Sequence, residues 1–355
     1  MNGGFDGKPQ RLWPEAEDVV PILAPRHGSD FDCGHGRRRT RPPRLTAADF
    51  TPERMLRPSA EPPDAGWRRS LYRLSGGLLS VPPSAAELRR RELIAQIKTP
   101  IVGCRTVAFV SRKGGVGKTT TCLLVGHSFA CHRGDRVIAI DANPDAGTLG
   151  HRLRRETAET LPSLLNGRQA VRRDADVRAY TSQAPSRLEV VAGDERDTVE
   201  RPLGRSDVGR AISVLARHFN LLCLDTAAGV LGSANRGVLD AADQIVVVCT
   251  ASLDTSRAAS ATLDWLELHG HEELAFSAVV ALNAIRDEPS AVDLDRIEEH
   301  FASRCRACVR IPWDRHLESG AEVVPEELRP ETREAYLELA AAVARGFTDP
   351  TERRF

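Results

Sequence analysis

Residues 113–120 read Lys-Gly-Gly-Val-Gly-Lys-Thr-Thr and gather three glycines, two lysines and two threonines in one short run. Glycines let backbone N–H groups converge on phosphate oxygens, and a helix that starts just behind them directs its positive end at the same group. In such a loop Lys118 would reach the β- and γ-phosphates of a nucleotide, and the hydroxyl of Thr119 would be a ligand of Mg²⁺. The chain has four lysines among 49 Lys+Arg, so two of them in one loop stand out against an arginine-rich background.

The segments on either side supply the elements that this loop needs. Val107–Val110 is an apolar run of strand length that leads into the loop, and a helix-like run follows it through Cys131. Strand, glycine-rich loop and helix in this order are typical of a P-loop, which disfavours the competing interpretation of an ordinary glycine-rich turn. The sequence therefore predicts a phosphate-binding loop at this position.

Further apolar runs of strand length alternate with helix-length segments through the rest of the chain. Continuous apolar strands separated by helices indicate a parallel sheet that is covered on both faces. We expect an α/β fold with a doubly wound, mostly parallel sheet, in which a P-loop NTPase domain spans residues 101–348 and a tail follows over 349–355. The predicted strands are 107–110, 137–140, 188–191, 221–224, 245–248, 278–282 and 308–311, and a last helix is predicted over 331–345.

The first hundred residues differ in composition from the rest. They hold 13 of the 22 prolines and 17 Lys+Arg against 12 Asp+Glu, which leaves 32 against 37 for the remainder. This composition predicts a mostly disordered, Pro/Arg-rich arm over residues 1–64. A basic arm could favour an anionic partner, although a solvated linker explains the same excess of charge.

Residues 65–100 are predicted to form a helical extension in two pieces. Apolar residues recur at helical spacing over 66–79, with arginines between them. Farther along, Ser84 precedes Glu87 by three positions, the capping-box arrangement, and predicts a helix over 85–98. The two pieces could pack on the domain or form a docking site for a membrane surface or a partner protein, and the sequence leaves both open.

Composition also bears on other classes of protein. At 355 residues and 41% hydrophobic content the chain can bury a large core, and its eight scattered cysteines are typical of buried thiols in a reduced compartment. The close pair Cys305 and Cys308 is weak evidence for zinc or redox chemistry. No apolar run reaches the roughly 18 residues that cross a bilayer. The start of the chain lacks a signal-peptide pattern, so we expect a cytoplasmic protein.

The glycine-rich loop resembles the deviant Walker A motif of the MinD/ParA family of P-loop ATPases, in which an additional lysine opens the motif. Lys113 is the matching position, and the resemblance implies that it crosses an ATP-sandwiched homodimer to touch the partner's nucleotide. Arg112 departs from the general pattern, which has a glycine there, and is tolerable if its φ is negative. The same match implies that the nucleotide of the chain's own subunit is held by Gly114, Gly115, Val116, Gly117, Lys118, Thr119 and Thr120.

Two further segments are similar to the acidic motifs of that family. Asp141 matches the first aspartate of switch I, and Asn143 stands where many relatives have a second aspartate that helps to position the attacking water. An amide bonds water but cannot accept a proton, so this departure from the family predicts hydrolysis that is slow or that needs a partner. Asp225 ends an apolar strand like the Walker B aspartate. The implied catalytic residues are Lys113, Lys118, Asp141 and Asn143, and the implied Mg²⁺ site is Thr119, Asp141 and Asp225.

Two more positions match the family at the adenine-binding site, and the front of the chain resembles one subfamily. Asn283 matches the asparagine that contacts adenine in relatives, and Pro312 lies in a segment that resembles the loop closing over the base. The front of the chain, with Gly66-Trp67-Arg68-Arg69 and residues 83–89 ahead of the P-loop, looks like the EspI-like ATPases associated with type VII (ESX) secretion. In that subfamily a proline-rich arm precedes the ATPase domain.

The resemblance implies a homodimer that forms on ATP and Mg²⁺ and works as a slow nucleotide switch, as an accessory or regulator of the type VII secretion machinery. The alternatives are a ParA-type partitioning ATPase on DNA and a MinD-type positioning factor on membranes. The net acidic body and the lack of a helix-turn-helix pattern disfavour DNA, whereas residues 66–79 could bring the protein to the inner face of the membrane. A scaffold that binds ATP without hydrolysing it also stays open because of Asn143.

Overall fold

The computed structural model describes Leu74 and residues 82–144, 147–194, 203–229, 232–287 and 292–347. The chain divides into two compact units, Met1–Glu61 and Pro62–Phe355, and the described residues all belong to the second. The predicted arm over 1–64 and the predicted tail over 349–355 lie outside the described residues. So does the predicted element over 66–79, apart from Leu74, whose side chain is exposed.

One sheet forms the centre of the second unit, and in the described part of the chain it has eight strands. Their order in space is β3-β4-β2-β5-β1-β6-β7-β8, and every pairing is parallel except that of β3 with β4. All seven predicted strands are present, because each apolar run is buried on both faces of a parallel sheet. The strand β3 was not predicted, since two residues are too short for a hydrophobic pattern. The strands are β1 (Arg105–Ser111), β2 (Val137–Asp141), β3 (Ser182–Gln183), β4 (Glu189–Val191), β5 (Leu221–Ala228), β6 (Gln244–Thr250), β7 (Val279–Asn283) and β8 (Ala307–Ile311).

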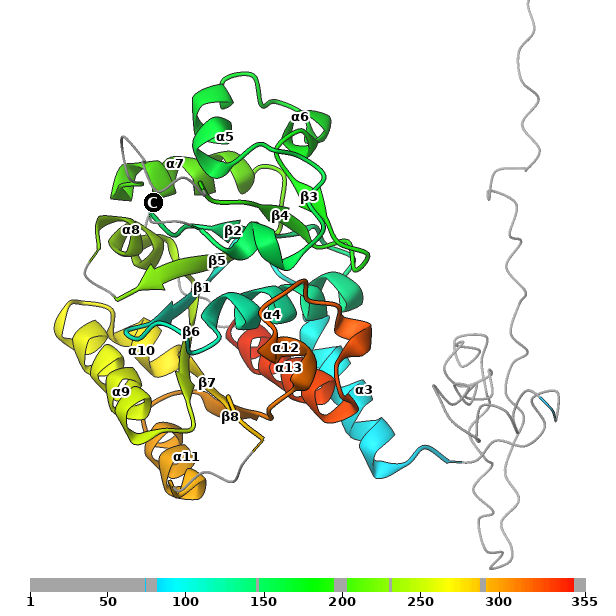
Figure 1. Ribbon diagram of the computed structural model, residues 1–355, viewed down its shortest axis with the longest axis vertical. Coiled ribbons are helices and arrows are strands. Elements are labelled where there is room, and N and C mark those ends of the chain that lie inside the picture. Colours follow the sequence, from blue (N-terminus) through cyan, green and yellow to red (C-terminus); the bar gives the residue numbers. More distant parts are fainter. Residues whose placement is uncertain are drawn as a thin grey trace, which may run out of the picture. The chain divides into compact units, whose positions relative to one another are not determined.

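Helices cover both faces of this sheet (Figure 1), which confirms the doubly wound α/β fold. One face carries α3 (Ala85–Ile97), α4 (Lys118–His132) and α13 (Pro330–Ala344), with the 3-10 turns η2 (Leu149–Arg152), η3 (Pro325–Glu327) and η4 (Arg345–Phe347). The other face carries α5 (Leu161–Gly167), α7 (Arg205–Leu215), α8 (Ser233–Ala241), α9 (Leu253–Leu268), α10 (Glu272–Ser277) and α11 (Leu294–Ala302). Two short helices, α6 (Asp174–Arg178) and α12 (Arg315–Glu318), lie in connections.

The helix predicted over 85–98 is confirmed as α3, and it begins as its sequence indicates. The Ser84 side chain accepts a hydrogen bond from the Glu87 N–H at 3.2 Å, which satisfies one of the free donors at the helix start. Leu93 and Ile97 are buried, and α3 packs against α13 and α4. This part of the extension is therefore packed on the P-loop side of the sheet.

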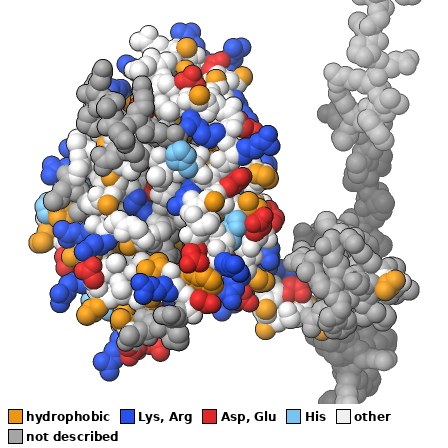
Figure 2. Space-filling model, viewed as in Figure 1, with side chains coloured by type: hydrophobic (Ala, Val, Ile, Leu, Met, Phe, Trp, Pro, Cys, Tyr) orange, Lys and Arg blue, Asp and Glu red, His pale blue; other side chains and the backbone are white. Residues whose placement is uncertain are grey.

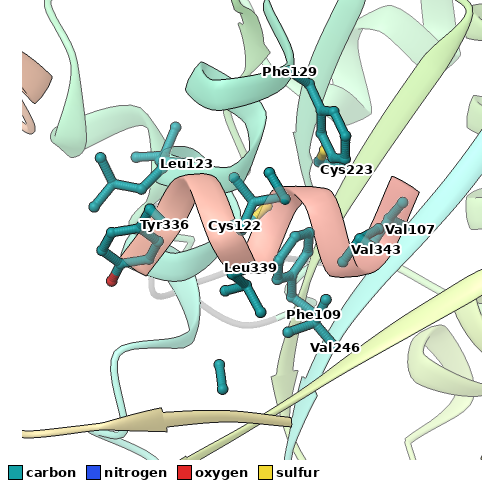
Figure 3. Packing of buried hydrophobic residues seen from close by; sticks show 14 of the residues in the cluster. Val107, Phe109, Cys122, Leu123, Phe129, Cys223, Val246, Tyr336, Leu339 and Val343 are labelled. Atoms are coloured by element: carbon teal, nitrogen blue, oxygen red, sulfur yellow. The ribbon is translucent and has the colours of Figure 1, made fainter. Parts of the chain in front are cut away.

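The alanine-rich helix α13 is central to the core on the same face. Ala340, Ala341 and Ala342 are fully buried, and their small side chains let the helix approach its neighbours closely. Figure 3 shows α13 among residues of α4 and β1; the labelled members of this cluster include Cys122, Leu123, Phe129, Val107, Phe109, Tyr336, Leu339 and Val343. The packing holds α4, and with it the loop at its start, against the sheet. Among the described helices, none is long and apolar enough to cross a bilayer.

Candidate functional site

The loop of residues 112–117 joins β1 to α4 at the carboxyl end of the sheet. Gly117 is the residue before α4 and has a φ of 85°, a left-handed conformation that glycine adopts without strain. No side chain of the described residues caps this helix start, so its first N–H groups face the loop and form an anion-binding end. Arg112 has no positive φ, so the departure from the glycine of the general pattern costs no backbone strain.

Three of the predicted site residues meet at the start of α4. The Lys118 ammonium donates to Oδ1 of Asp225 at 3.1 Å and also to the backbone carbonyl of Thr226. The Thr119 hydroxyl donates to Oδ2 of the same carboxylate at 2.6 Å. The side chains of Lys118 and Asp225 are only 12% and 3% exposed, so this is a largely desolvated ion pair and strongly charge-assisted.

Asp141 lies beside this group because its strand is the neighbour of Asp225's strand. Asp141 and Asp225 are direct partners in the register of β2 and β5, and both are buried. The Asp141 carboxylate accepts the backbone N–H of Leu149 at 3.0 Å and of Asn143 at 3.2 Å. Burial, helped by the negative charge of Asp225, raises the pKa of Asp141 to about 7. A cation between the two carboxylates would relieve that repulsion.

Two predicted catalytic residues lie outside this cluster. The Lys113 ammonium pairs with Oδ2 of Asp254 at the start of α9, at 3.0 Å, and both side chains are substantially exposed, 49% and 73%. It thus points away from the Lys118–Asp225 pair of its own chain. Asn143 follows β2 and is half-buried; its backbone N–H donates to Asp141, and the two residues after Pro144 are not described.

A pocket of about 300 Å³ opens beside the loop. Its lining includes Gly115, Gly117 and Thr120 from the loop and the start of α4, together with Asn283 at the end of β7 and Pro312 after β8. The Asn283 amide donates to the Val116 carbonyl at 2.8 Å and to the Thr121 hydroxyl at 3.3 Å, whereas its buried Oδ1 has no hydrogen-bond partner among the described residues. Asn283 therefore holds the loop at Val116, and its Oδ1 is a buried acceptor without a partner in the described part of the chain.

The pocket also contains residues that the sequence interpretation did not name as site residues. Trp313 lies between the predicted Pro312 and the buried Asp314, so the prediction of Pro312 could have indicated Trp313 as a pocket residue as well. Burial alone would raise the pKa of Asp314, but N–H groups of Arg329 and His316 and the hydroxyl of Thr332 hold it below its ordinary value. Arg152, at the end of η2, also lines the pocket and belongs to no motif. Its place is set by tertiary structure.

Comparisons with known proteins agree with this fold. A family model described as an AAA domain matches residues 104–265. A ParA family ATPase from Chlorobium tepidum has a similar structure with a TM-score of 0.56 at 21% identity, covering 67% of this chain and 98% of that one. The chain carries a MinD/ParA-like P-loop domain. The septum site-determining protein MinD of Pyrococcus horikoshii, solved in complex with Mg-ADP, shares the fold with a TM-score of 0.52 at 17% identity, covering 67% and 94%.

The chain also resembles a curated protein over most of its length. The ESX-1 secretion-associated protein EspI of Mycobacterium tuberculosis is 34% identical over 284 residues, which are 79% of this chain and 42% of EspI. The chain spans about two fifths of the length of this relative. The predicted resemblance to the MinD/ParA family and to EspI is confirmed.

The cysteine pair of the MinD/ParA-like domain has no metal partners among the described residues, where no group of three or more His, Cys, Asp or Glu could hold a metal ion. Cys305 is buried and its thiol donates to the Phe301 carbonyl at 3.0 Å. Burial raises the pKa of Cys305 to about 11 and raises that of Cys308 further. A thiol held protonated in this way is a poor nucleophile.

Proposed function

We propose that the protein is an ATP-binding, slowly ATP-hydrolysing nucleotide switch that dimerises on ATP and serves as an accessory or regulator of type VII secretion. The observation that carries the proposal is the cluster of Lys118, Thr119 and Asp225 at the start of α4, next to a pocket with room for a nucleoside. A P-loop needs this arrangement, because the lysine, the helix end and the pocket have to meet along one phosphate chain.

The pocket supports adenine as the base. The free Oδ1 of Asn283 is a buried acceptor, and an unsatisfied buried acceptor favours a ligand that donates a hydrogen bond to it. The exocyclic amino group of adenine is such a donor. Trp313 and Pro312 supply the apolar surface that a flat ring requires, and the phosphates then extend along the glycines toward Lys118.

The donor set near the loop fits Mg²⁺. Asp141, Asp225 and the Thr119 hydroxyl offer oxygen ligands, which this hard cation prefers. Burial, and after it the negative charge of Asp225, raises the pKa of Asp141, and a cation here would oppose both effects. Bound there, Mg²⁺ would neutralise charge on the phosphate oxygens. In our proposal Asp225 and Thr119 hold the ion through direct or water-mediated contacts, and Lys118 moves from Asp225 to the phosphates.

The proposed slow hydrolysis depends on Asn143, and the proposed dimerisation depends on Lys113. Asn143 lies beside Asp141 and offers an amide where a carboxylate would activate water, so we expect low turnover. Lys113 is half-exposed and held by a surface ion pair of the kind that contributes about 0–1 kcal/mol, so it can leave Asp254 at little cost. A second subunit's nucleotide would give it a stronger anionic partner.

The link to secretion is supported by the EspI resemblance, and the rival functions by the wider family. On the face in Figure 2, basic and acidic side chains are interspersed, without the continuous basic stripe that favours DNA.

Capture of partners from cells tests the secretion role. The tagged chain is used, with Mg-AMPPNP for the wild type and with Lys118→Ala as the nucleotide-free form. We expect secretion components in the first sample and not in the second. Chromosome or septum proteins in their place would contradict the secretion role and favour a ParA- or MinD-type function.

A further inference from the structure

Two hydrogen bonds of backbone groups, one at each end, hold the turn η2 in which Arg152 lies. Arg152 ends η2, whose first residue, Leu149, is buried and donates its N–H to Asp141. The carbonyl of Arg152 accepts the Val323 N–H at 2.8 Å, which ties η2 to the loop that follows α12. The residue therefore connects the segment after β2 to the base side of the pocket.

The side chain of Arg152 turns into the pocket that Gly115, Gly117 and Thr120 also line. Gly320 makes room for it: a Cβ there would lie 3.3 Å from one terminal nitrogen of the guanidinium, and the φ of 66° at Gly320 is one that glycine favours. A guanidinium in this position shares the pocket with Thr120 at the start of α4, so a ligand in the pocket would lie within its reach.

The charge of Arg152 is unpaired within the described part of the chain. Its guanidinium forms no ion pair or hydrogen bond with another described residue, and burial is the largest influence on its pKa, which lies below the ordinary value in spite of Asp225. Nearby Asp314 is already engaged by the N–H groups of His316 and Arg329. Lys118, the cation at the start of α4, is paired with Asp225. A partly desolvated guanidinium that no described carboxylate contacts directly favours an anionic ligand.

We propose that Arg152 binds the phosphate chain of the nucleotide within its own subunit, at the phosphates that ADP and ATP share. This inference rests on the proposed function, since it assigns a further binding residue to the same site. Arg152 lines the same pocket as Gly115, Gly117 and Thr120 and its guanidinium lies next to Gly320, whereas Lys118 is held by Asp225. Arg152 thus contributes to affinity for both nucleotides and does not discriminate the γ-phosphate.

The test is calorimetric titration of the full chain with Mg-ADP and with Mg-AMPPNP. For Arg152→Gln we expect the Kd of both ligands to rise by about tenfold or more, because a charge-assisted contact to phosphate is lost, and the ratio of the two Kd values to stay unchanged. Arg152→Lys keeps the charge but loses the planar fork, and should fall between the wild type and Arg152→Gln. Arg154→Gln is the matched control, since Arg154 is exposed two residues away and does not line the pocket.

Each other outcome decides against the inference or against its basis. Unchanged Kd values for Arg152→Gln, with a wild type that binds both ligands, would overturn the role of Arg152 and leave the proposed function intact. A loss confined to AMPPNP would overturn the placement at the shared phosphates. Equal losses in Arg154→Gln would show a general effect of charge. A wild type that binds neither ligand would overturn the proposed function itself. Unfolding curves of each variant show whether a loss of affinity comes from loss of folded protein. If Arg152→Gln is unstable, the Kd values of Arg152→Lys decide the role of Arg152.

Discussion

Asp141 and Asp225 are two buried carboxyl groups at the ends of adjacent strands, in direct register. Such a pair is costly when both groups are charged, because neither is fully solvated and each raises the energy of the other. The pKa of Asp141 is raised to about 7, whereas the carboxyl group of an unfolded chain titrates near 3.8. The folded protein therefore binds a proton here that the unfolded chain has already lost at pH 5–7, and folding stability falls as the pH rises through that range.

Asp141→Asn removes this titration and should change the pH dependence of stability. Relative to the wild type, the free energy of unfolding of the variant should gain about 2 kcal/mol between pH 5 and pH 8, in the absence of Mg²⁺. Urea unfolding at several pH values measures it, with the exposed Asp287→Asn as the control. Parallel pH profiles for wild type and Asp141→Asn would contradict the account of the carboxylate pair.

Asn143 is the residue on which the predicted rate depends. Its amide can hold a water molecule but cannot take the proton, and general-base catalysis contributes roughly 10²–10⁴-fold where it operates. We expect Asn143→Asp to raise phosphate release from ATP by at least about tenfold. Asn166→Asp, an exposed change in α5, should leave the rate unchanged. An equal rate in Asn143→Asp and wild type, with Lys118→Ala inactive, would show that this position does not limit hydrolysis.

At the scale of elements, the loop between β1 and α4 is held in shape from its far side by β7. Asn283, the last residue of β7, donates to the Val116 carbonyl, and a Cβ on Gly117 would lie 2.8 Å from that amide nitrogen. Gly117 also has a positive φ. Both the conformation and the space therefore require glycine at this position.

Gly117→Ala should destabilise the protein by about 1–3 kcal/mol and weaken nucleotide binding, because the loop has to shift away from Asn283. Gly134→Ala is the matched control, since a Cβ there meets no atom within 4 Å and its φ is not positive. Thermal unfolding and Mg-ADP titration measure the two effects. If both glycine variants behaved alike, the clamp between the loop and β7 would have no energetic role.

The elements differ in how well the sequence predicted them, for a physical reason. Strands buried on both faces need continuous apolar runs, and α3 needs a cap, so local residues indicated them in advance. The strand β3 and the turn η2 have no such local signature, because pairing to β4 and bonds to Asp141 hold them. Arg152 was missed for this reason. The sequence also could not predict the ion pair of Lys113 with Asp254, because α9 lies 140 residues farther along the chain.

At the scale of the whole molecule, the proposed switch depends on a second copy of the chain. The site residues that the sequence grouped together divide in space: Lys118, Thr119, Asp141 and Asp225 lie together, whereas Lys113 points away from them. An ammonium that leaves its own site can complete another. This division is what the resemblance to the MinD/ParA family implies for an ATP-sandwiched dimer.

Lys113→Ala should therefore separate binding from dimerisation. We expect its monomer to bind Mg-ADP with less than about a threefold change in Kd, because the lost surface pair is weak. The dimer that wild-type protein forms with Mg-ATP should be absent. Light scattering after gel filtration, with ATP or ADP in the buffer, gives the mass of each form, and Arg112→Ala is the neighbouring control. A Lys113→Ala dimer in ATP, or a wild type that stays monomeric, would refute the role of Lys113.

Calorimetric titration of the folded full chain with Mg-ATP tests the central claim most directly. If the start of α4 is a phosphate site, wild-type protein should bind with a Kd in the micromolar range or below, about −8 kcal/mol or stronger. Lys118→Ala should weaken binding by at least about tenfold, since the lost ammonium would contact the phosphates. It should also lower stability, because the buried Asp225 loses its partner, so the variant is titrated well below its unfolding temperature. Folded wild-type protein that shows no heat of binding, or a Lys118→Ala variant that binds as tightly as wild type, would contradict the account.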